Sequence, residues 1–358
     1  MPHNVPFQIV QLTPPGRGAV ATLLVEGPRA LAAVAARFRA KGARMLTDYP
    51  KDRLVFGHFG AAEGQEVVIR CRGEDSVEVH CLGGPAAVAM IQAALVEQGG
   101  RVCPWEDWLA VCEADPIAAA ARQALAKART ARTAAILLDQ YHGALRRELE
   151  EIDRAVCQGD HGSALARLDT LLARAPVGRH LTEPWQVVLA GSPNVGKSSL
   201  VNALVGYPRA IVHPAPGTTR DVVSVTTAMD GWPVELSDTA GLHAGGGAVE
   251  RAGVQRAREK LAAADLVLLV FDRSVPWSEV DEDLIRAWPG GLVIHNKCDL
   301  AAAGAGRPPG VATSALTGQG VEGLVCHIAQ RLVPSPPPAG VAVPFTSDQV
   351  EHLIRLRG

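Results

Sequence analysis

The stretch "GSPNVGKSSL", residues 191–200, contains two glycines, Gly191 and Gly196, and the second is followed by a lysine and a serine. In this pattern the glycines let the backbone wrap closely around phosphate oxygens, with the loop N–H groups pointing inward. Lys197 would reach the β- and γ-phosphates, and Ser198 would ligate Mg²⁺. The stretch follows a strand-like run and precedes a helical pattern, which is the context that the motif requires. It predicts a phosphate-binding loop whose nucleotide contacts are Asn194, Val195, Gly196, Lys197, Ser198 and Ser199.

Three later segments indicate which base is bound. Asp238 opens "DTAG" and can hold Mg²⁺ through water, while the N–H of Gly241 can bond the γ-phosphate. Asp299 ends "NKCD" and can accept from guanine N1–H and N2–H together, whereas adenine offers neither donor. "TSALTG", residues 313–318, would supply a backbone N–H for guanine O6. These segments predict GTP or GDP as the ligand, with further contacts from Thr239, Ala240, Asn296, Lys297, Ser314, Ala315 and Leu316.

The surrounding pattern predicts an α/β fold, a P-loop GTPase of the Ras-like type, over residues 183–333. "WQVVLAG", "DLVLLVFD" and "GLVIHNKCD" are short apolar runs of the buried-strand type. "VVSVTTAMDGWPVELSD" predicts a hairpin that turns at Asp230-Gly231. Together these runs indicate a doubly wound sheet with one antiparallel edge.

Three further regions are predicted. Residues 1–108 indicate a small α/β domain with strand-like runs and a helix that starts at Pro85. Trp105 and Trp108 are expected to cap its core. Residues 109–182 indicate a helical domain, broken near "QGDHG". Residues 334–358 indicate a proline-rich linker and one C-terminal helix, with Thr346 and Gln349 spaced as a capping box.

Some polar residues suggest sites but are interpreted as bystanders. Arg122, Arg129 and Arg132 are predicted to lie on one helix face, where a solvated surface is favoured over a nucleic-acid contact. His80, His295 and Cys298 could act as ligands, but packed or partly exposed roles are more common for isolated residues of these types. None of these residues is therefore predicted to carry the chemistry.

Composition limits the classes of protein to which this chain could belong. Its hydrophobic fraction of 47% is ordinary for a globular protein, and a formal net charge of −2 gives no global field to attract a polyanion. The seven cysteines are scattered, which indicates reduced thiols in place of disulfides or a zinc site. No apolar stretch approaches the ~20 residues of a membrane helix. We therefore expect a cytoplasmic protein with no membrane segment and no signal peptide.

The motifs leave the mechanism of hydrolysis open. Ras-like proteins orient the attacking water with a glutamine just after the DxxG segment. Leu242 occupies that place here, and an apolar side chain cannot orient water. Catalysis must therefore use another group.

The sequence resembles the tRNA-modification GTPase MnmE family, also called TrmE. The resemblance runs over "GSPNVGKSSLVNAL", "AIVHPAPGTTRDVV", "DTAGLH", "VERAGVQRA" and "NKCDL", and over "LTPPGRGAV" and "VEVHCLGGPA" near the N-terminus. It implies a G protein activated by dimerisation of its G domains, and so a homodimer. It also implies a role in wobble-uridine modification of tRNA, together with a flavoprotein partner.

The resemblance implies two catalytic devices beside Lys197. In the family, a K⁺ ion sits where an arginine finger would otherwise lie, and the matching ligands are Asn194, His213, Ala215 and Thr218. Thr219 matches the family's Mg²⁺ threonine, and Glu250 matches a glutamate that orients water. The alternative for Glu250 is an ordinary glutamate at the start of a surface helix.

Several family features are replaced. Of four residues that contact 5-formyl-tetrahydrofolate in the family, only Glu78 has a counterpart; Leu24 replaces the arginine, and the two lysines fall in altered segments. "CPWEDWLAVCEAD" replaces another family stretch, and the chain ends "EHLIRLRG" without the family's Cys-x-Gly-Lys tail. Glu78 is expected to be structural and folate binding weak or absent. Two interpretations remain: an MnmE-type GTPase active on tRNA, or a divergent regulatory GTPase or scaffold that keeps only the nucleotide switch.

Overall fold

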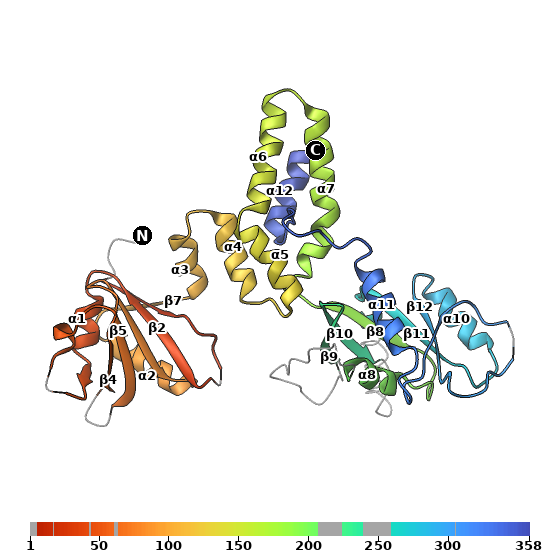
Figure 1. Ribbon diagram of the computed structural model, residues 1–358, viewed down its shortest axis with the longest axis horizontal. Helices are drawn as coiled ribbons and strands as arrows, with labels where there is room; N and C mark the ends of the chain where they lie inside the picture. The colour runs from red at the N-terminus through yellow and green to blue at the C-terminus, as the bar shows by residue number, and fades with distance from the viewer. Residues whose placement is uncertain are drawn as a thin grey trace. The chain divides into compact units, whose positions relative to one another are not determined.

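The computed structural model describes residues 6–16, 18–42, 44–60, 64–206, 224–238, 259–304 and 306–358. The chain divides into two compact units, Met1–Pro116 and Ile117–Gly358. Each unit is built around its own sheet, and the second also contains a group of helices (Figure 1).

The first unit is a seven-stranded sheet with the order β3-β4-β5-β6-β2-β1-β7. Neighbouring strands are antiparallel, except that β1 and β7 run parallel. The alternation of apolar and polar residues along β5 and β6 gives each strand one core face, as expected for period-2 patterning. The strand bounds are β1 Gln8–Gln11, β2 Val20–Glu26, β3 Phe38–Ala40, β4 Leu54–Phe59, β5 Gln65–Cys71, β6 Ser76–Leu82 and β7 Arg101–Cys103.

Helices pack on both faces of this sheet. α1 (Ala30–Ala35) and α2 (Pro85–Val96) cover the face that holds the main core of the unit. Pro85 stands in the first turn of α2, as predicted. On the other face, α3 (Trp105–Cys112) packs Trp105 and Trp108 against Val10, Leu24 and Cys103, so the predicted tryptophan cap is confirmed.

Five helices form the helical part of the second unit. α6 (Ala144–Cys157) and α7 (His161–Arg179) make a hairpin, and the predicted break lies at residues 158–160. α12 (Ser347–Arg357) packs against α7 and has the predicted capping box from Thr346 and Gln349 (Figure 1). α4 (Pro116–Leu125) and α5 (Ala131–Tyr141) precede them in the chain.

The prediction of one helix face carrying three arginines is wrong. α4 ends at Leu125 and α5 starts at Ala131, so Arg122 and Arg132 lie on different helices. Thr130 caps α5 by accepting from Thr133 N at 3.2 Å, and its hydroxyl also donates to the Gly231 carbonyl at 2.6 Å. The helix break therefore follows from an N-cap that is anchored to the hairpin of β9 (Ser224–Met229) and β10 (Trp232–Asp238), a contact that sequence spacing does not show.

The segment 341–345 packs between the helices. Gln140 is fully buried; its amide nitrogen donates to Val341 O at 3.0 Å, and its amide oxygen accepts from Val343 N at 3.1 Å. A Cβ on Gly178 of α7 would collide with the carbonyl of Pro344, so only glycine lets the segment approach this closely. The result is a polar anchor that joins positions about 200 residues apart in sequence.

The sheet of the second unit has six strands with the order β13-β12-β11-β8-β10-β9. All neighbours are parallel except β10 and β9, so the predicted doubly wound sheet with one antiparallel edge is confirmed. The hairpin turns at Asp230 and Gly231 as predicted, with φ of +47° and +79°. The strands are β8 Trp185–Ala190, β9 Ser224–Met229, β10 Trp232–Asp238, β11 Leu266–Asp272, β12 Leu292–Asn296 and β13 Val311–Ala312.

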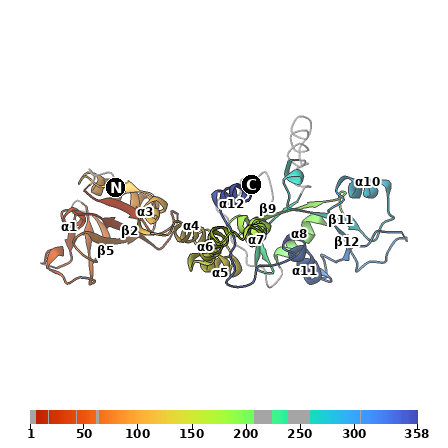
Figure 2. The ribbon, with the colours of Figure 1, turned by 90° about the horizontal axis from the view of Figure 1, so that it is seen from above.

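Helices cover both faces of this sheet, as the buried-strand runs predict. α8 (Lys197–Val205) and α11 (Val321–Leu332) share one core with the sheet, while α10 (Glu279–Ala287) packs on the opposite face (Figure 2). The parallel strands β8, β10, β11 and β12 all end at one edge, and the segments predicted to bind the nucleotide follow these ends.

Candidate nucleotide site

The phosphate-binding loop joins β8 to α8. Gly191 and Gly196 have φ of +157° and +94°, and a Cβ on either would collide with a neighbour, Val270 O or Asn296 Nδ2 respectively. Only glycine combines these conformations with these close approaches. Asn194 stands at the exposed tip of the loop with φ of +65°, a left-handed conformation that asparagine tolerates better than most residues.

Lys197 begins α8 and is 5% exposed. Its ammonium donates to the carbonyls of Gly191 and Ser192, each at 2.9 Å. Burial lowers the pKa of Lys197, and the nearby Asp238 carboxylate opposes that shift. The ammonium is thus held inside the loop by backbone oxygens, which phosphate oxygens of a nucleotide could replace.

Ser198 and Asp238 meet across the loop. The Ser198 hydroxyl donates to Asp238 Oδ2 at 2.5 Å, and Asp238 closes β10 with 5% of its surface exposed. A hydroxyl and a carboxylate are hard oxygen donors of the kind that Mg²⁺ prefers. The donor set therefore fits the magnesium site predicted from the sequence.

Asn296 connects the phosphate loop with the base-binding segments. It ends β12, is 1% exposed, and its amide nitrogen donates to Val195 O at 2.9 Å. Its amide oxygen accepts from Ala315 N at 3.1 Å and from the Thr313 hydroxyl at 3.4 Å. One buried side chain therefore fixes the spacing between three segments that were predicted to contact one nucleotide.

The other predicted base contacts lie beside Asn296. Ser314 is fully buried, with its N–H bonded to Gln319 O at 2.8 Å, whereas Asp299 and Leu316 are exposed. Lys297 has φ of +61°, and its ammonium pairs with Asp272 at 2.6 Å. Sequence reasoning missed Asp272, although an aspartate that closes a fully buried strand at this edge of the sheet was a usable signal.

Several predicted site residues lie outside the described residues, so their roles stay predictions. They are His213, Ala215, Thr218, Thr219, Thr239, Ala240, Gly241 and Glu250. The chain on either side of them is described: α8 and β9 flank residues 207–223, and β10 ends at Asp238.

In the first unit, Leu24 and Glu78 are cross-strand neighbours on β2 and β6. Leu24 is 2% exposed beneath Trp105 and Trp108. Glu78 is 6% exposed; Arg72 contacts its Oε1 at 2.7 Å, and Arg70 its Oε2 at 3.5 Å. The carboxylate is thus already neutralised by the protein, which matches a structural role.

His80, His295 and Cys298, which the sequence suggests as ligands but favours as bystanders, make ordinary contacts. His80 Nδ1 lies 3.0 Å from the Thr22 hydroxyl, and its Nε2 lies 3.6 Å from Glu78. His295 Nε2 lies 2.9 Å from Pro308 O, and Cys298 is partly exposed. Within the described residues there is no group of three or more His, Cys, Asp or Glu side chains that could hold a metal.

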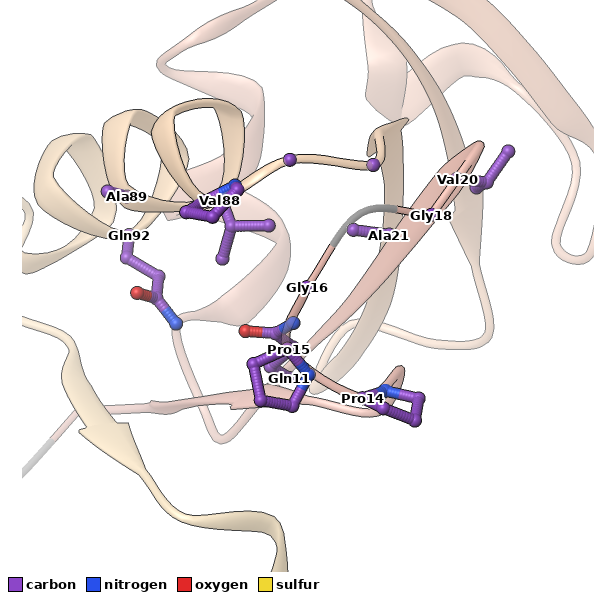
Figure 3. A pocket seen from close by; sticks show the side chains of 13 residues that line it. Gln11, Pro14, Pro15, Gly16, Gly18, Val20, Ala21, Val88, Ala89 and Gln92 are labelled. Atoms are coloured by element: carbon purple, nitrogen blue, oxygen red, sulfur yellow. The ribbon is translucent and has the colours of Figure 1, made fainter. Parts of the chain in front are cut away.

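Two glycine-containing segments of the first unit meet at a cavity of about 180 Å³. The loop around Gly16 and Gly18 lies on one side and the start of α2 on the other, and Gln11 and Gln92 supply the amide side chains of the lining (Figure 3). Gly83 N donates to Ala19 O at 3.0 Å, and a Cβ on Gly83 would collide with Gly18 O. Glycine at this position allows the two segments to touch backbone to backbone.

Helix length and cysteine pairing bear on the predictions about membrane segments and disulfides. In the described part of the chain, no helix combines the length and the apolar character needed to cross a bilayer. The seven cysteines are all described, and no two of them form a disulfide.

Comparison with known proteins agrees with this geometry. Residues 186–297 match the family described as 50S ribosome-binding GTPase. The G domain of the FeoB iron transporter of T. maritima is 29% identical, over 42% of this chain and 99% of that chain, with a TM-score of 0.31. The family match over residues 186–297 identifies the predicted P-loop GTPase domain in the second unit, and the chain is a GTPase.

Similarity extends beyond the GTPase domain. A tRNA modification GTPase MnmE of Synechococcus sp. (strain CC9311) is 36% identical over 88% of this chain and 79% of that protein. A protein of the same name from Chloroflexus aurantiacus is 34% identical over 96% of this chain and 85% of that protein. This identity over most of both chains shows that the protein belongs to the family of the tRNA modification GTPase MnmE.

Proposed function

We propose that this GTPase is stimulated by K⁺, acts as a dimer of G domains, and serves the modification of wobble uridine in tRNA. The observation that carries the proposal is the position of Asn194. Its left-handed backbone places an exposed amide at the tip of the phosphate loop, next to Val195. An amide oxygen there suits a monovalent cation that would stabilise charge on the phosphates.

The protein groups around the phosphates support hydrolysis with Mg²⁺. Ser198 and Asp238 would hold the ion, with Thr219 as a further ligand by family resemblance. Bound there, Mg²⁺ neutralises negative charge on the β- and γ-phosphates. Lys197 would exchange its bonds to the carbonyls of Gly191 and Ser192 for bonds to the phosphates.

Water must still be oriented for attack on the γ-phosphate. Leu242 cannot do this, so we propose Glu250 for that role, as family resemblance suggests. Glu250→Ala should keep GTP binding and K⁺-dependent pairing of G domains but slow turnover. Full activity of Glu250→Ala would contradict this assignment.

The name of the relatives refers to tRNA modification, which supports tRNA as the substrate, whereas the partners rest on the family resemblance alone. We propose that the chain acts in the cytoplasm on tRNA, as a homodimer and together with a flavoprotein. A pull-down with the protein locked in its GTP state would identify the partner.

Potassium dependence is the direct test. Turnover is measured in KCl and in NaCl at matched ionic strength and protein concentration. A site of this kind is worth on the order of 10³-fold in rate, so KCl should support most of the activity. Equal turnover in the two salts would refute the K⁺ mechanism.

Variants of the loop asparagine make the test specific. Asn194→Gly removes the amide but keeps a residue suited to φ of +65°, whereas Asn194→Ala also adds backbone strain. Both should lose the K⁺ effect and keep GTP affinity. Asn202→Ala, at an exposed position of α8, is the matched control and should respond to K⁺ like the unaltered protein.

A second function is favoured by the first unit. Leu24 offers no hydrogen bond, and Glu78 is already paired with Arg70 and Arg72. These contacts do not suit a folate, which fits a divergent regulatory GTPase or scaffold. Deleting the gene separates the two: loss of wobble-uridine modification supports the tRNA function, and unchanged modification supports the alternative.

A further inference from the structure

Asp272 and Lys297 form an ion pair at the base side of the nucleotide site. Asp272 closes β11 and is 9% exposed; Lys297 follows β12 and pairs with it at 2.6 Å. In the parallel pairing of these strands Asp272 lies opposite Asn296, the neighbour of Lys297. The pair therefore links the end of β11 to the segment after β12 that carries the predicted guanine contact Asp299.

The backbone of Lys297 is held in an unfavourable conformation. Its φ is +61°, in the left-handed region that residues with a long side chain rarely adopt. This bend lets Asn296 point into the buried junction with Val195, while Asp299 two residues later stays exposed. A contact that holds the Lys297 backbone in place therefore also sets the direction of the chain from the end of β12 to Asp299.

Asp272 is itself rigidly placed. Its Oδ1 accepts from the N–H of Ser274 at 2.8 Å and from the Ser274 hydroxyl at 2.6 Å, which leaves Oδ2 for Lys297. Burial alone would raise the pKa of Asp272, but the hydrogen bonds from Lys297 and Ser274 outweigh it and hold the pKa below its usual range. The carboxylate is therefore charged whenever a nucleotide binds near neutral pH.

Arg307 secures the turn that carries Asp272. Its guanidinium donates to the carbonyls of Asp272 at 3.1 Å and Arg273 at 3.2 Å, and also bonds Val275 O. It lies 5.7 Å from the ring centroid of Trp277, within the range of a cation–π contact. The turn after β11 thus has several anchors that do not involve the nucleotide.

We propose that Asp272 is a positioning residue for the guanine base: it holds Lys297 in its left-handed conformation and so places Asp299 for the base edge. Asp272 acts through Lys297 and touches no reacting atom. Loss of the pair therefore weakens GTP and GDP binding by the same factor and leaves the hydrolysis step of bound GTP unchanged. Because Asp299 keeps its two acceptors, the preference for guanine over adenine persists.

The test measures equilibrium binding of GDP and of a non-hydrolysable GTP analogue to Asp272→Asn, together with turnover at saturating GTP. Both dissociation constants should rise about tenfold, as for loss of a partly buried charge-assisted pair, with the rate at saturation within about twofold of the unaltered protein. Asp283→Asn is the control, since Asp283 is exposed on α10 and forms an ion pair with Arg286 of the same helix. It should change neither quantity.

A double-mutant cycle shows whether Asp272 acts through Lys297. Asp272→Asn should cost no further affinity in a Lys297→Met background. Ser274→Ala removes one of the two hydrogen bonds to Oδ1 of Asp272. It should therefore reduce nucleotide affinity less than Asp272→Asn does, and this smaller loss should also vanish in the Lys297→Met background. Additive losses in the cycle, a loss for GTP but not GDP, or a reduced rate at saturation would each overturn the proposal.

Discussion

In the six-stranded sheet, Asp238, Asp272 and Asn296 stand at the last positions of β10, β11 and β12. Because these strands are parallel to β8 or to each other, their ends meet at one edge, beside Lys197. In the seven-stranded sheet, Glu78 lies in the middle of β6, directly opposite Arg70 of β5. The two sheets thus bury charge at different points along their strands.

The difference determines what a buried charge can do. Glu78 in mid-strand is paired by two arginines of the same unit, Arg70 directly opposite it on β5 and Arg72 just past the end of β5. A residue at a strand end has no further ladder beyond it, and Asp238 there accepts from Ser198 of α8, beside Lys197, whose ammonium bonds the loop carbonyls; a ligand can replace these bonds. We therefore expect strand-end substitutions to change nucleotide binding and mid-strand substitutions to change stability.

The largest effect is expected beyond the end of β12, at Asp299. Asp299→Asn should weaken GTP binding by about 10³-fold or more and favour xanthine nucleotides, because the two acceptors that would face guanine N1–H and N2–H are replaced by an amide with one acceptor and one donor group. Competition of GTP, XTP and ATP for a labelled nucleotide measures the change. If ATP competes as well as GTP with the unaltered protein, the assignment of the base is wrong.

A mid-strand substitution should instead cost stability. Glu78→Gln leaves Arg70 and Arg72 without their buried partner and should lower the free energy of unfolding by about 2–3 kcal/mol. Urea unfolding measures this, and GDP affinity should not change. Glu97→Gln, which removes an exposed pair with Arg37, should cost less than about 1 kcal/mol. A large loss of GDP affinity in Glu78→Gln would contradict the separation of the two sheets.

The contact of Thr130 at the opposite end of β10 allows the two ends of one strand to be compared. Thr130 bonds the Gly231 carbonyl at 2.6 Å and caps α5, so Thr130→Val should cost about 1–2 kcal/mol of unfolding free energy. Nucleotide affinity should stay constant, since this contact lies at the other end of the strand from Asp238. Thr170→Val, on an exposed face of α7, is the control and should change stability by less than about 0.5 kcal/mol.

Much of the fold and the phosphate side of the site could be predicted because each rests on a local rule. The glycines of the phosphate loop, the Asp230-Gly231 turn and the Thr346 capping box each specify backbone geometry within a few residues. The buried apolar runs likewise predict parallel strands that are covered on both faces.

The rest depends on contacts between distant segments. The break before α5 arises at Thr130, whose hydroxyl reaches Gly231, and residues 126–129 contain no strong helix breaker. From its polar side chain Gln140 is expected at the surface of a helix, yet its amide is buried against the backbone of residues 341–343. Asp272 has a partner that is 25 residues away, just past the end of another strand, β12.

The smallest effect is expected at the position where the family binds folate. In a calorimetric titration of 5-formyl-tetrahydrofolate into the protein, the heat should not exceed the heat of dilution. Leu24 replaces the arginine and is buried beneath Trp105 and Trp108 of α3, a helix within the altered segment.

Glu78 cannot make up for that loss. Arg72 takes one of its carboxylate oxygens at 2.7 Å, and Arg70 and His80 lie within 3.6 Å of the other. A ligand would have to displace a guanidinium from a carboxylate that is 6% exposed, and each lost charge-assisted bond costs about 1.5–3 kcal/mol. Glu78→Gln should therefore leave the flat titration unchanged. Micromolar binding that disappears in this variant would show that Glu78 of the first sheet can exchange its ion pairs for a ligand, and the contrast between the two sheets would fail.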